Sequence, residues 1–561
     1  MALVKLPFPI ENTGDGINNS PGNNLSSMLP KNLQQACEEY PFLAEYLRYV
    51  PFDQIGVPDY YPKVTRNLKD LEERNLIYKA NEGLFVHIYP DPSGERDLYI
   101  PIEPHTTVNL DTIIPEVELK LLDWTEKIGA EETTEGKKQR LLEAIDNIVT
   151  TNGTSGKVKV TPRELEALKY VLVRDKVGFG LLEPLLLDPN IEDISCSGVG
   201  SIFIEHKVFK SLQAAIVFPT EEELDEFVIW LGEWIKRPVT VRNPIVDATL
   251  PDGSRINIVY GSDVSRRGSN FTIRKFAGTP PSIMNLIEWG TMDYMMAAYL
   301  SFILEAGMNV FVVGATASGK TTTMNAITTF ILPDKKIVSI EDTPELQVPH
   351  KNWIREVTRG TGKDQKGAEV GMFDLLKAAL RQRPDRIIVG EIRGEEGAIA
   401  FQAMQTGHGV MSTFHAASVE RLIQRLTGDP INIPKTYIDN LESVVIQAAV
   451  KAPGSIGLVR RVTSINEIVG YDPATQSFSF IEAFRWNPAN DTFEFPGYMN
   501  SYLLEEKIAI KRGIPPFKRK AIYTELKRRA KILQRLHQDR KVRDFYEVFQ
   551  VLAEAHRQNL L

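Results

Sequence analysis

The residues from Gly314 to Thr321, GATASGKT, have the types and the spacing of a phosphate-binding loop. The glycines let the backbone curl so that several N–H groups face one anion, and Lys320 can reach the β- and γ-phosphate oxygens of a nucleotide. The Thr321 hydroxyl can ligate Mg²⁺ beside them. We therefore predict that ATP and Mg²⁺ bind here. The predicted nucleotide-binding residues are Gly314, Ser318, Gly319, Lys320, Thr321 and Thr322.

Acidic residues follow two short apolar segments that are typical of buried strands. RIIVGE ends in Glu391, after a glycine that permits close approach, and KIVSIEDTPEL supplies Glu341, Asp342 and Glu345. A phosphate loop needs such an acid to hold the metal or to polarise water. One acidic residue after a strand is usually a solvated cap. Two such groups in the same sheet as a phosphate loop instead favour a role in binding the metal or polarising water. We predict Glu391 and Glu341 as catalytic, and Glu341 and Asp342, with Thr321, as Mg²⁺ ligands.

Two histidines, His408 and His415, flank a further apolar strand in TGHGVMSTFHA. Where several strand ends converge on a phosphate site, His415 can sense the γ-phosphate, and we include it among the catalytic candidates. A lone histidine is more often structural than catalytic. Both interpretations stay open for His415 at this point.

The strands that carry these residues indicate a parallel sheet. VFVVG, KIVSIED, RIIVGEI and GVMSTFH are short and apolar, and helical stretches separate them. Buried runs of this kind that alternate with helices are typical of a sheet covered on both faces. Val310–Val313 is the predicted strand before the phosphate loop, and Thr321–Phe330 is the predicted helix after it.

The whole chain has the composition of a soluble protein with several domains. Its 561 residues exceed what one hydrophobic core can hold, and 43% are hydrophobic and 25% charged. A formal net charge of -8 gives no global signature of nucleic-acid binding. Cys37 and Cys196 are the two cysteines, too few for a disulfide framework or a zinc site, and no secretory signal or spanning helix is predicted. A cytoplasmic location fits best.

Changes in composition divide the chain into five parts, with AGTPPS, Ala277–Ser282, as the best linker. The predicted parts are a disordered N-terminus (1–32, because its second half is rich in Asn, Gly, Ser and Pro), a small α+β segment (33–115), an α+β domain (116–278), an ATPase domain (279–504) and a basic helical tail (505–561).

The ordered set GATASGKT, SIEDTPEL, RIIVGEIRG and TGHGVMSTFHA resembles the Walker A, Asp box, atypical Walker B and His box of the secretion ATPase superfamily. That superfamily drives type II and type IV secretion, type IV pili and archaella. RDKVGFGLLEPLLLDPNIEDISCSG, LPDGSRIN and SRRGSNFTIRKF are similar to the N-terminal domain of its archaeal branch, and RLIQRLTGDPINIP extends the similarity downstream. The resemblance implies an α/β fold: a RecA-like P-loop ATPase domain preceded by an α+β N-terminal domain. An extra N-terminal α+β segment and a basic helical C-terminal tail complete it.

Among the branches, the sequence most resembles the archaellum assembly and rotation ATPase. The bacterial type II secretion and pilus-extension ATPases usually carry a four-cysteine zinc insertion after the His box, and this sequence has none. Archaeal type IV pilus and secretion ATPases share most of the motifs, so they stay as an alternative.

The resemblance also implies partners. It implies a homohexameric ring in which a neighbouring N-terminal domain contributes an arginine, with Arg255 in DGSR and Arg274 in FTIRKF as candidates. Arg266 and Arg267 are weaker candidates, and a surface or core-paired role is the other interpretation for all four. The implied partners are a polytopic membrane platform protein and accessory proteins of the filament machinery. The protein would contact the inner face of the cell membrane peripherally.

Two further functions compete with a mechanochemical motor. RecA-like hexamers also translocate nucleic acid, which the acidic composition argues against, so we expect no nucleic-acid partner. A P-loop phosphotransferase would need an acceptor pocket, for which the sequence offers no candidate.

Overall fold

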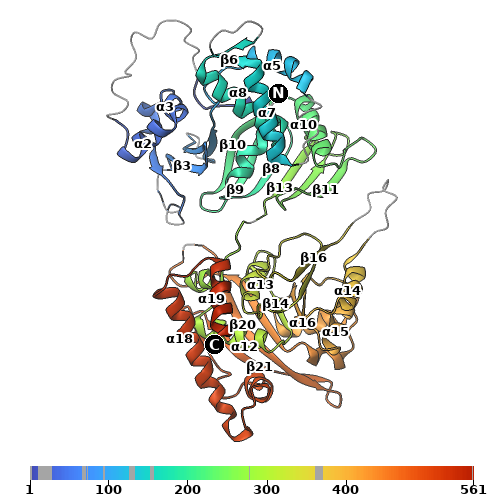
Figure 1. The fold of residues 1–561 in the computed structure, drawn as a ribbon. Helices are drawn as coiled ribbons and strands as arrows, with labels where there is room; N and C mark the ends of the chain where they lie inside the picture. The colour runs from blue at the N-terminus through green and yellow to red at the C-terminus, as the bar shows by residue number, and fades with distance from the viewer. Residues whose placement is uncertain are drawn as a thin grey trace. The chain divides into compact units, whose positions relative to one another are not determined.

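A computed structural model divides the chain into two compact units, Met1–Phe276 and Ala277–Leu561 (Figure 1). The division falls at the start of the segment that the sequence predicts as the linker. No helix among the described residues is long and apolar enough to cross a membrane. The structure describes residues 3–9, 28–65, 68, 71, 74–91, 95–124, 133–151, 157–276, 278–359, 370–455, 457–558 and 560.

Unit 1 is built on a sheet of eleven strands in the order β11-β12-β13-β8-β9-β10-β5-β4-β3-β2, with β1 paired to β10. The predicted antiparallel arrangement holds from β8 to β13, and β4 and β5 form the predicted hairpin. The strands are β1 (Leu3–Val4), β2 (Asp59–Tyr61), β3 (Leu76–Asn81), β4 (Leu84–Tyr89), β5 (Leu98–Ile102), β8 (Ile191–Cys196), β9 (Gly200–His206), β10 (Lys210–Phe218), β11 (Ile245–Thr249), β12 (Arg255–Val259) and β13 (Asn270–Arg274).

Three groups of helices pack in unit 1. One group lies on the β3–β5 end of the sheet, a second covers β8–β10, and a third forms a helical cluster beside the short parallel pair β6 (Val149–Thr150) and β7 (Val158–Lys159). The helices are α2 (Lys31–Glu39), α3 (Pro41–Leu47), α4 (Phe52–Ile55), α5 (Ile113–Leu121), η2 (Leu122–Trp124), α7 (Thr134–Ile148), α8 (Pro162–Lys176), η3 (Gly180–Leu182), α9 (Glu183–Leu187) and α10 (Glu221–Trp234).

The predicted boundary between 33–115 and 116–278 is wrong, because one sheet contains strands from both parts. β5 pairs with β10 in parallel, with Leu98 opposite Gln213 and Tyr99 opposite Ala214. These strands are more than a hundred residues apart in the sequence. A local pattern of apolar residues carries no information about such a distant pairing. The sequence alone therefore predicts 33–115 and 116–278 as separate domains.

The prediction that 1–32 is disordered is also wrong at its ends. β1 pairs antiparallel with β10, and Phe8 and Leu29 are buried in the same cluster as α2 and α3. The Asn- and Gly-rich composition that motivated the prediction lies mostly in 10–27, outside the described residues. Phe8 and Leu29, on either side of that stretch, pack against the apolar cluster of α2 and α3, and this removes their side chains from water.

Unit 2 contains a nine-stranded sheet in the order β16-β15-β17-β18-β14-β19-β20-β21-β22. The strands from β16 to β19 run in parallel, as predicted, and an antiparallel extension from β20 to β22 follows. The strands are β14 (Val310–Val313), β15 (Ile337–Glu341), β16 (Trp353–Val357), β17 (Arg386–Glu391), β18 (Gly409–Phe414), β19 (Ser443–Val450), β20 (Val459–Asp472), β21 (Ser477–Asn487) and β22 (Thr492–Glu494).

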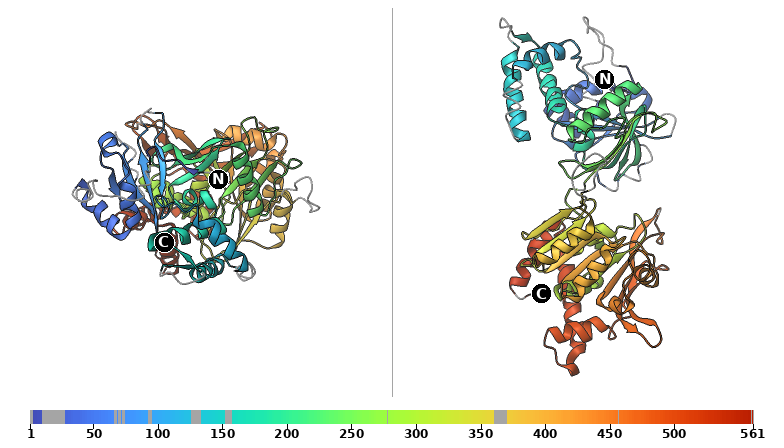
Figure 2. Two further views of the ribbon diagram at one scale, coloured as in Figure 1. Left: turned by 90° about the horizontal axis from the view of Figure 1, so that it is seen from above. Right: turned by 90° about the vertical axis from the view of Figure 1, so that its right-hand side faces the viewer.

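Helices cover both faces of this sheet (Figure 2), and the four residues of β14 show why. Val310 and Val312 point into the cluster formed with α11–α13, α18 and α19, whereas Phe311 and Val313 point into the cluster formed with α14–α16. The helices are α11 (Ile283–Glu288), α12 (Tyr294–Glu305), α13 (Lys320–Thr328), α14 (Met372–Arg381), α15 (Glu396–Gln405), α16 (Val419–Thr427), η4 (Lys435–Asn440), η5 (Leu503–Ile508), α17 (Ala509–Lys511), η6 (Pro516–Ala521), α18 (Ile522–Gln538) and α19 (Phe545–Arg557).

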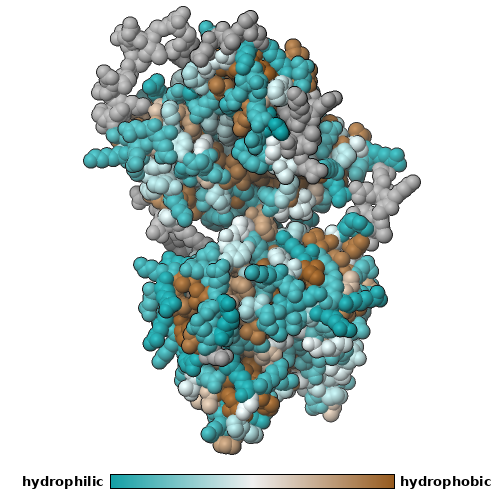
Figure 3. Space-filling view, viewed as in Figure 1, coloured by the Kyte–Doolittle hydropathy of each residue, from teal (hydrophilic) through white to brown (hydrophobic). Residues whose placement is uncertain are grey.

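The basic segment 505–561 is part of unit 2 in the structure. Leu526 and Leu533 of α18 are buried in the core that contains α12, so the apolar side of this helix packs on its own unit. Lys527, Arg528, Lys531 and Arg535 of the same helix are exposed. On the visible face over α18 and α19, hydrophilic residues lie on both sides of a hydrophobic strip (Figure 3).

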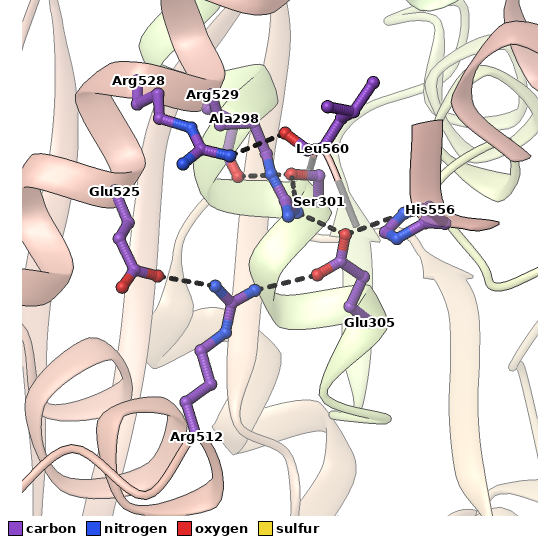
Figure 4. Close-up of polar contacts among 9 residues, drawn as sticks. All are labelled: Ala298, Ser301, Glu305, Arg512, Glu525, Arg528, Arg529, His556 and Leu560. Atoms are coloured by element: carbon purple, nitrogen blue, oxygen red, sulfur yellow. Dashed lines mark hydrogen bonds and ion pairs between the residues drawn. The ribbon is translucent and has the colours of Figure 1, made fainter. Parts of the chain in front are cut away.

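A buried ion cluster joins these last helices to α12 (Figure 4). Glu305, the last residue of α12, pairs through one carboxylate oxygen with Arg529 and His556 and through the other with Arg512 at 3.0 Å. Arg529 also donates to Ser301 Oγ at 3.1 Å and is 3% exposed. Burial raises the pKa of Glu305, but the His556 and Arg529 contacts outweigh it, so that pKa lies below its usual 4.5.

We expect Glu305→Ala to lower the free energy of unfolding by about 3 kcal/mol, because it leaves the buried Arg529 guanidinium without its carboxylate. Chemical denaturation at pH 7 measures this loss. Since the folded-state pKa is depressed, the contribution of Glu305 is present above pH 4.5 and is lost as the pH falls through the folded-state pKa. The matched control is Glu554→Ala, which removes an exposed partner of Arg557 and should change stability by about 0.5 kcal/mol or less. Equal effects of the two variants would contradict this account.

Candidate nucleotide-binding and catalytic site

The phosphate loop joins β14 to α13 in a tightly curled backbone. Ala317 and Gly319 both adopt left-handed conformations, with φ of 60° and 95°. Gly314 admits no side chain, because a Cβ there would lie 2.2 Å from the Gln447 carbonyl oxygen and 2.5 Å from Ser318 Oγ. A loop with left-handed residues on either side of Ser318 can turn several backbone N–H groups toward one point, which forms an anion-binding concavity at the start of a helix.

Lys320 is the first residue of α13, and its side chain lies back across the loop. Its Nζ donates hydrogen bonds to the carbonyl oxygens of Gly314 at 3.1 Å and Ala315 at 3.0 Å. Burial lowers the pKa of Lys320, while the charge of Glu391 acts in the opposite direction. The ammonium therefore already lies where phosphate oxygens would compete with these carbonyls for it.

The hydroxyl residues of the loop divide into two roles. Ser318 is buried and donates to the Ala315 carbonyl at 2.8 Å, which fixes the turn from within. Thr321 and Thr322 are half-buried in the first turn of α13. Mg²⁺ at such loops takes one protein hydroxyl and completes its shell with phosphate oxygens and water, so this arrangement fits the ion.

One cavity of about 450 Å³ adjoins the loop and collects residues from three strand ends. Glu391 ends β17 and His415 follows β18, and both strands run parallel to β14, so their carboxyl ends meet at the edge where the loop begins. The cavity-lining residues are Thr316, Ala317, Lys320, Glu391, Ile392, Arg393, His415 and Arg425. Lys320, Glu391 and His415 are thus brought together. His408 precedes β18 and lies at its opposite end.

Glu391 pairs with an arginine that the sequence analysis did not single out. Arg393 Nε lies 2.9 Å and its Nη2 2.5 Å from the same carboxylate oxygen of Glu391, while the Glu391 side chain stays 27% exposed. Glu391 also lines the cavity. An acid in this position can accept a hydrogen bond from a water molecule next to the γ-phosphate.

Glu341 has a different environment from Glu391. Its carboxylate is 2% exposed and accepts hydrogen bonds from the backbone N–H groups of Glu345 at 2.8 Å and Leu346 at 2.7 Å. Its second oxygen lies 3.4 Å from Arg355 Nε, and burial raises its pKa. Glu341 is not among the cavity-lining residues. Its contacts shape the loop after β15, which contains Asp342, and at Gly390 a Cβ would come within 3.2 Å of its side chain.

The predicted Mg²⁺ ligands, Thr321, Glu341 and Asp342, have different environments in the structure. Within the described ranges, no group of three or more His, Cys, Asp or Glu side chains is placed to hold a metal ion. Of the predicted set, Thr321 lies on the phosphate loop, whereas both oxygens of Glu341 already have protein partners. Thr321 therefore has the environment that best suits an ion bound together with phosphate.

Arg255 and Arg274, the candidate arginines, lie in unit 1 on neighbouring strands. They are directly opposite each other across β12 and β13. Their side chains are 49% and 69% exposed, and they pair with Asp247 at 3.5 Å and Asp193 at 3.2 Å. Each of these exposed guanidinium groups is therefore paired with an exposed carboxylate of the same unit.

Sequence reasoning missed three arginines near the loop. Arg393 stood inside the quoted RIIVGEIRG motif, so its spacing from Glu391 was an available signal. Arg425 of α16 lines the cavity and donates to the His415 carbonyl, and Arg460 of β20 donates to the Ala317 carbonyl at 3.2 Å. Arg425 lies within the RLIQRLTGDPINIP segment, which gives no indication of a contact with His415, and Arg460 lies in none of the motifs.

Comparisons with known proteins show which proteins the chain resembles. A family model described as Type II/IV secretion system protein matches residues 175–462. An uncharacterized protein of Methanocaldococcus jannaschii is 43% identical over 536 residues, covering 93% of this chain and 96% of that protein. Type IV secretion system protein PtlH of Bordetella pertussis is 31% identical over 272 residues, covering 44% of this chain and 78% of PtlH. The crystal structure of the pilus retraction motor PilT with bound ADP aligns with a TM-score of 0.37 and 23% identity, over 50% of this chain and 81% of that chain.

Proposed function

Because the chain belongs to the family of type II/IV secretion system proteins, we propose that it is a hexameric, ATP-hydrolysing motor. It powers assembly of an archaeal type IV pilus-like filament or archaellum through a polytopic membrane platform protein. The observation that carries this proposal is the cavity in which Lys320, Glu391 and His415 meet beside the phosphate loop. An ATPase of an archaeal type II/IV secretion or adhesive pilus system is the alternative within the same family.

The chemistry follows from the charges around the cavity. The loop N–H groups and Lys320 bind the β- and γ-phosphates, and Glu391 orients the attacking water through its second carboxylate oxygen. His415 lies where it can contact the γ-phosphate. Mg²⁺, when bound, supplies positive charge to the phosphate oxygens, and Thr321 holds it through its hydroxyl. Glu341 acts indirectly, by holding the loop that carries Asp342.

A ring explains the two exposed arginines of unit 1. In a homohexamer, Arg274, or Arg255 opposite it, reaches the phosphates bound by a neighbouring subunit and stabilises charge on the transferred phosphoryl group. Their high exposure and their exposed carboxylate partners support this, since such ion pairs are weak and exchange easily.

The exposed basic row of α18, Lys527, Arg528, Lys531 and Arg535, is the proposed contact with the membrane surface or with the platform protein. Each Lys or Arg near an anionic surface contributes about 1 kcal/mol, and salt weakens the contribution. The protein would then work in the cytoplasm, held peripherally at the inner face of the membrane, with accessory proteins of the filament machinery.

The proposed function predicts how ATP hydrolysis responds to added partners. We expect membranes that contain the platform protein to raise the ATPase rate, and single-stranded DNA to leave it unchanged. A variant with the four basic residues of α18 replaced by Gln should keep its basal rate but associate more weakly with membranes at low salt. The difference from the wild type should shrink at high salt, which screens the charges. Stimulation by DNA instead would favour a translocase, and equal rates with and without the platform would count against a motor of this kind.

A further inference from the structure

Arg460 reaches the phosphate loop from the antiparallel side of the sheet. Its Nε donates a hydrogen bond to the Ala317 carbonyl oxygen, 3.2 Å away, across 143 residues of sequence. Ala317 is the loop residue with a φ of 60°, a left-handed conformation that residues with a Cβ rarely adopt. The bond is therefore made to the loop residue whose backbone conformation is unfavourable for a residue with a Cβ.

The next residue, Arg461, explains why Arg460 can act as such a support. Arg461 is 7% exposed and binds Asp491 through Nε at 2.8 Å and Nη2 at 2.7 Å, while its Nη1 donates to the Trp289 carbonyl at 3.0 Å. Successive residues of a strand point to opposite faces. Anchoring Arg461 on one face of β20 therefore fixes the backbone from which Arg460 points toward the loop.

The absence of a side chain at Gly319 leaves room for the Arg460 side chain to lie against the loop. A Cβ on Gly319 would lie 3.1 Å from Arg460 Cδ and 2.9 Å from Gln447 Nε2. Gln447 of β19 is 2% exposed, so β19 and β20 together form a wall against the loop on the side away from β18. Arg460 is not among the residues that line the Glu391 cavity.

We propose that Arg460 is a positioning residue of the phosphate loop. Its Nε–H···O bond holds Ala317 in the left-handed conformation, and this keeps the following N–H groups aimed at the β-phosphate before a nucleotide arrives. The proposal rests on the proposed function, because it requires the loop to bind ATP. It adds that the antiparallel β19–β20 wall contributes to the affinity of the loop for phosphate, in addition to Lys320.

The test is the Arg460→Met variant, which keeps the length and apolar stem of the side chain but removes the donor. We expect its dissociation constants for ATP and for inorganic pyrophosphate to rise by the same factor, about tenfold, as expected when a hydrogen bond from a charged donor is lost. The melting temperature and the kcat at saturating ATP should stay near the wild-type values, so the effect appears in KM. Arg460→Lys keeps the charge without the Nε–H and should recover only part of the affinity.

The matched control is Arg485→Met on β21, which removes an exposed arginine of the same sheet that pairs with Glu482. It should leave both dissociation constants unchanged. Weaker ATP binding with unchanged pyrophosphate binding would overturn the proposal, since Arg460 would then act on another part of the nucleotide. Full recovery in Arg460→Lys, or a fall in kcat without a rise in KM, would overturn it as well. If the wild-type protein binds neither ligand, the proposed function itself fails.

Discussion

We expect Lys320→Ala to abolish tight ATP binding and to lower turnover at least ~10²-fold while the protein stays folded. Lys320 Nζ lies against the carbonyl oxygens of Gly314 and Ala315, at the place where β- and γ-phosphate oxygens would lie. Its loss removes the compact positive charge from the site. The side chain is not part of a hydrophobic cluster, so the core remains intact. Isothermal titration with ATP and a steady-state ATPase assay measure the two effects.

The control for this variant is Lys351→Ala, which removes an exposed lysine of the same unit and should bind and hydrolyse ATP normally. Near-normal turnover by folded Lys320→Ala protein would show that the loop is not the nucleotide site.

Mixing Lys320→Ala with Arg274→Ala protein extends the test to the ring. A mixed hexamer contains some interfaces with both Lys320 and Arg274 intact, so some activity should return, and its absence in demonstrably mixed rings would count against a trans-acting Arg274.

Glu391→Gln should bind ATP and hydrolyse it at least ~10²-fold more slowly, the scale of losing a group that acts on the attacking water. Glutamine has the same shape and can still accept a hydrogen bond from Arg393, so binding and folding should change little. The charge that polarises water is lost. Single-turnover hydrolysis together with a nucleotide-binding assay separates the two effects.

Glu341→Gln is the matched comparison, because the substitution is the same and the residue lies one strand farther from the loop strand. The amide oxygen can still accept from the Glu345 and Leu346 N–H groups, so we expect a smaller loss of rate than for Glu391→Gln. If both variants turned over ATP normally, these acids would serve only as caps of their strands, and the proposed active site would be wrong.

The phosphate loop and its flanking elements were predictable because their signal is local. The spacing of Gly314, Gly319 and Lys320, after four apolar residues and before a helix, encodes the strand, the turn and the anion site in one continuous segment. Parallel strands also bring their carboxyl ends to one edge, so the pattern of the sequence is enough to expect residues such as Glu391 and His415 near the loop.

Contacts between distant segments were not predictable from one sequence. Arg425 reaches the cavity from α16 and Arg460 reaches the loop from β20, and the sequence around each gives no indication of the segment that it contacts. The burial of Arg529 is similar: it belongs to a helix with several exposed basic residues, and its place on the face toward α12 follows from packing. The joining of β5 to β10 is a further example, because strand partners are chosen by tertiary structure.

The pairing of β5 and β1 with β10 has a consequence for shortened versions of this protein. Both of these strands come from the first 115 residues and occupy the same side of β10, so a chain without them would expose the backbone N–H and C=O groups of β10 to solvent. It would also uncover Ala215, which is buried in the cluster formed with α2 and α3. A bare strand with apolar side chains is a template for intermolecular β-pairing. The N-terminal segment thus protects the sheet against aggregation, and cutting the chain at the predicted domain boundary would remove that protection.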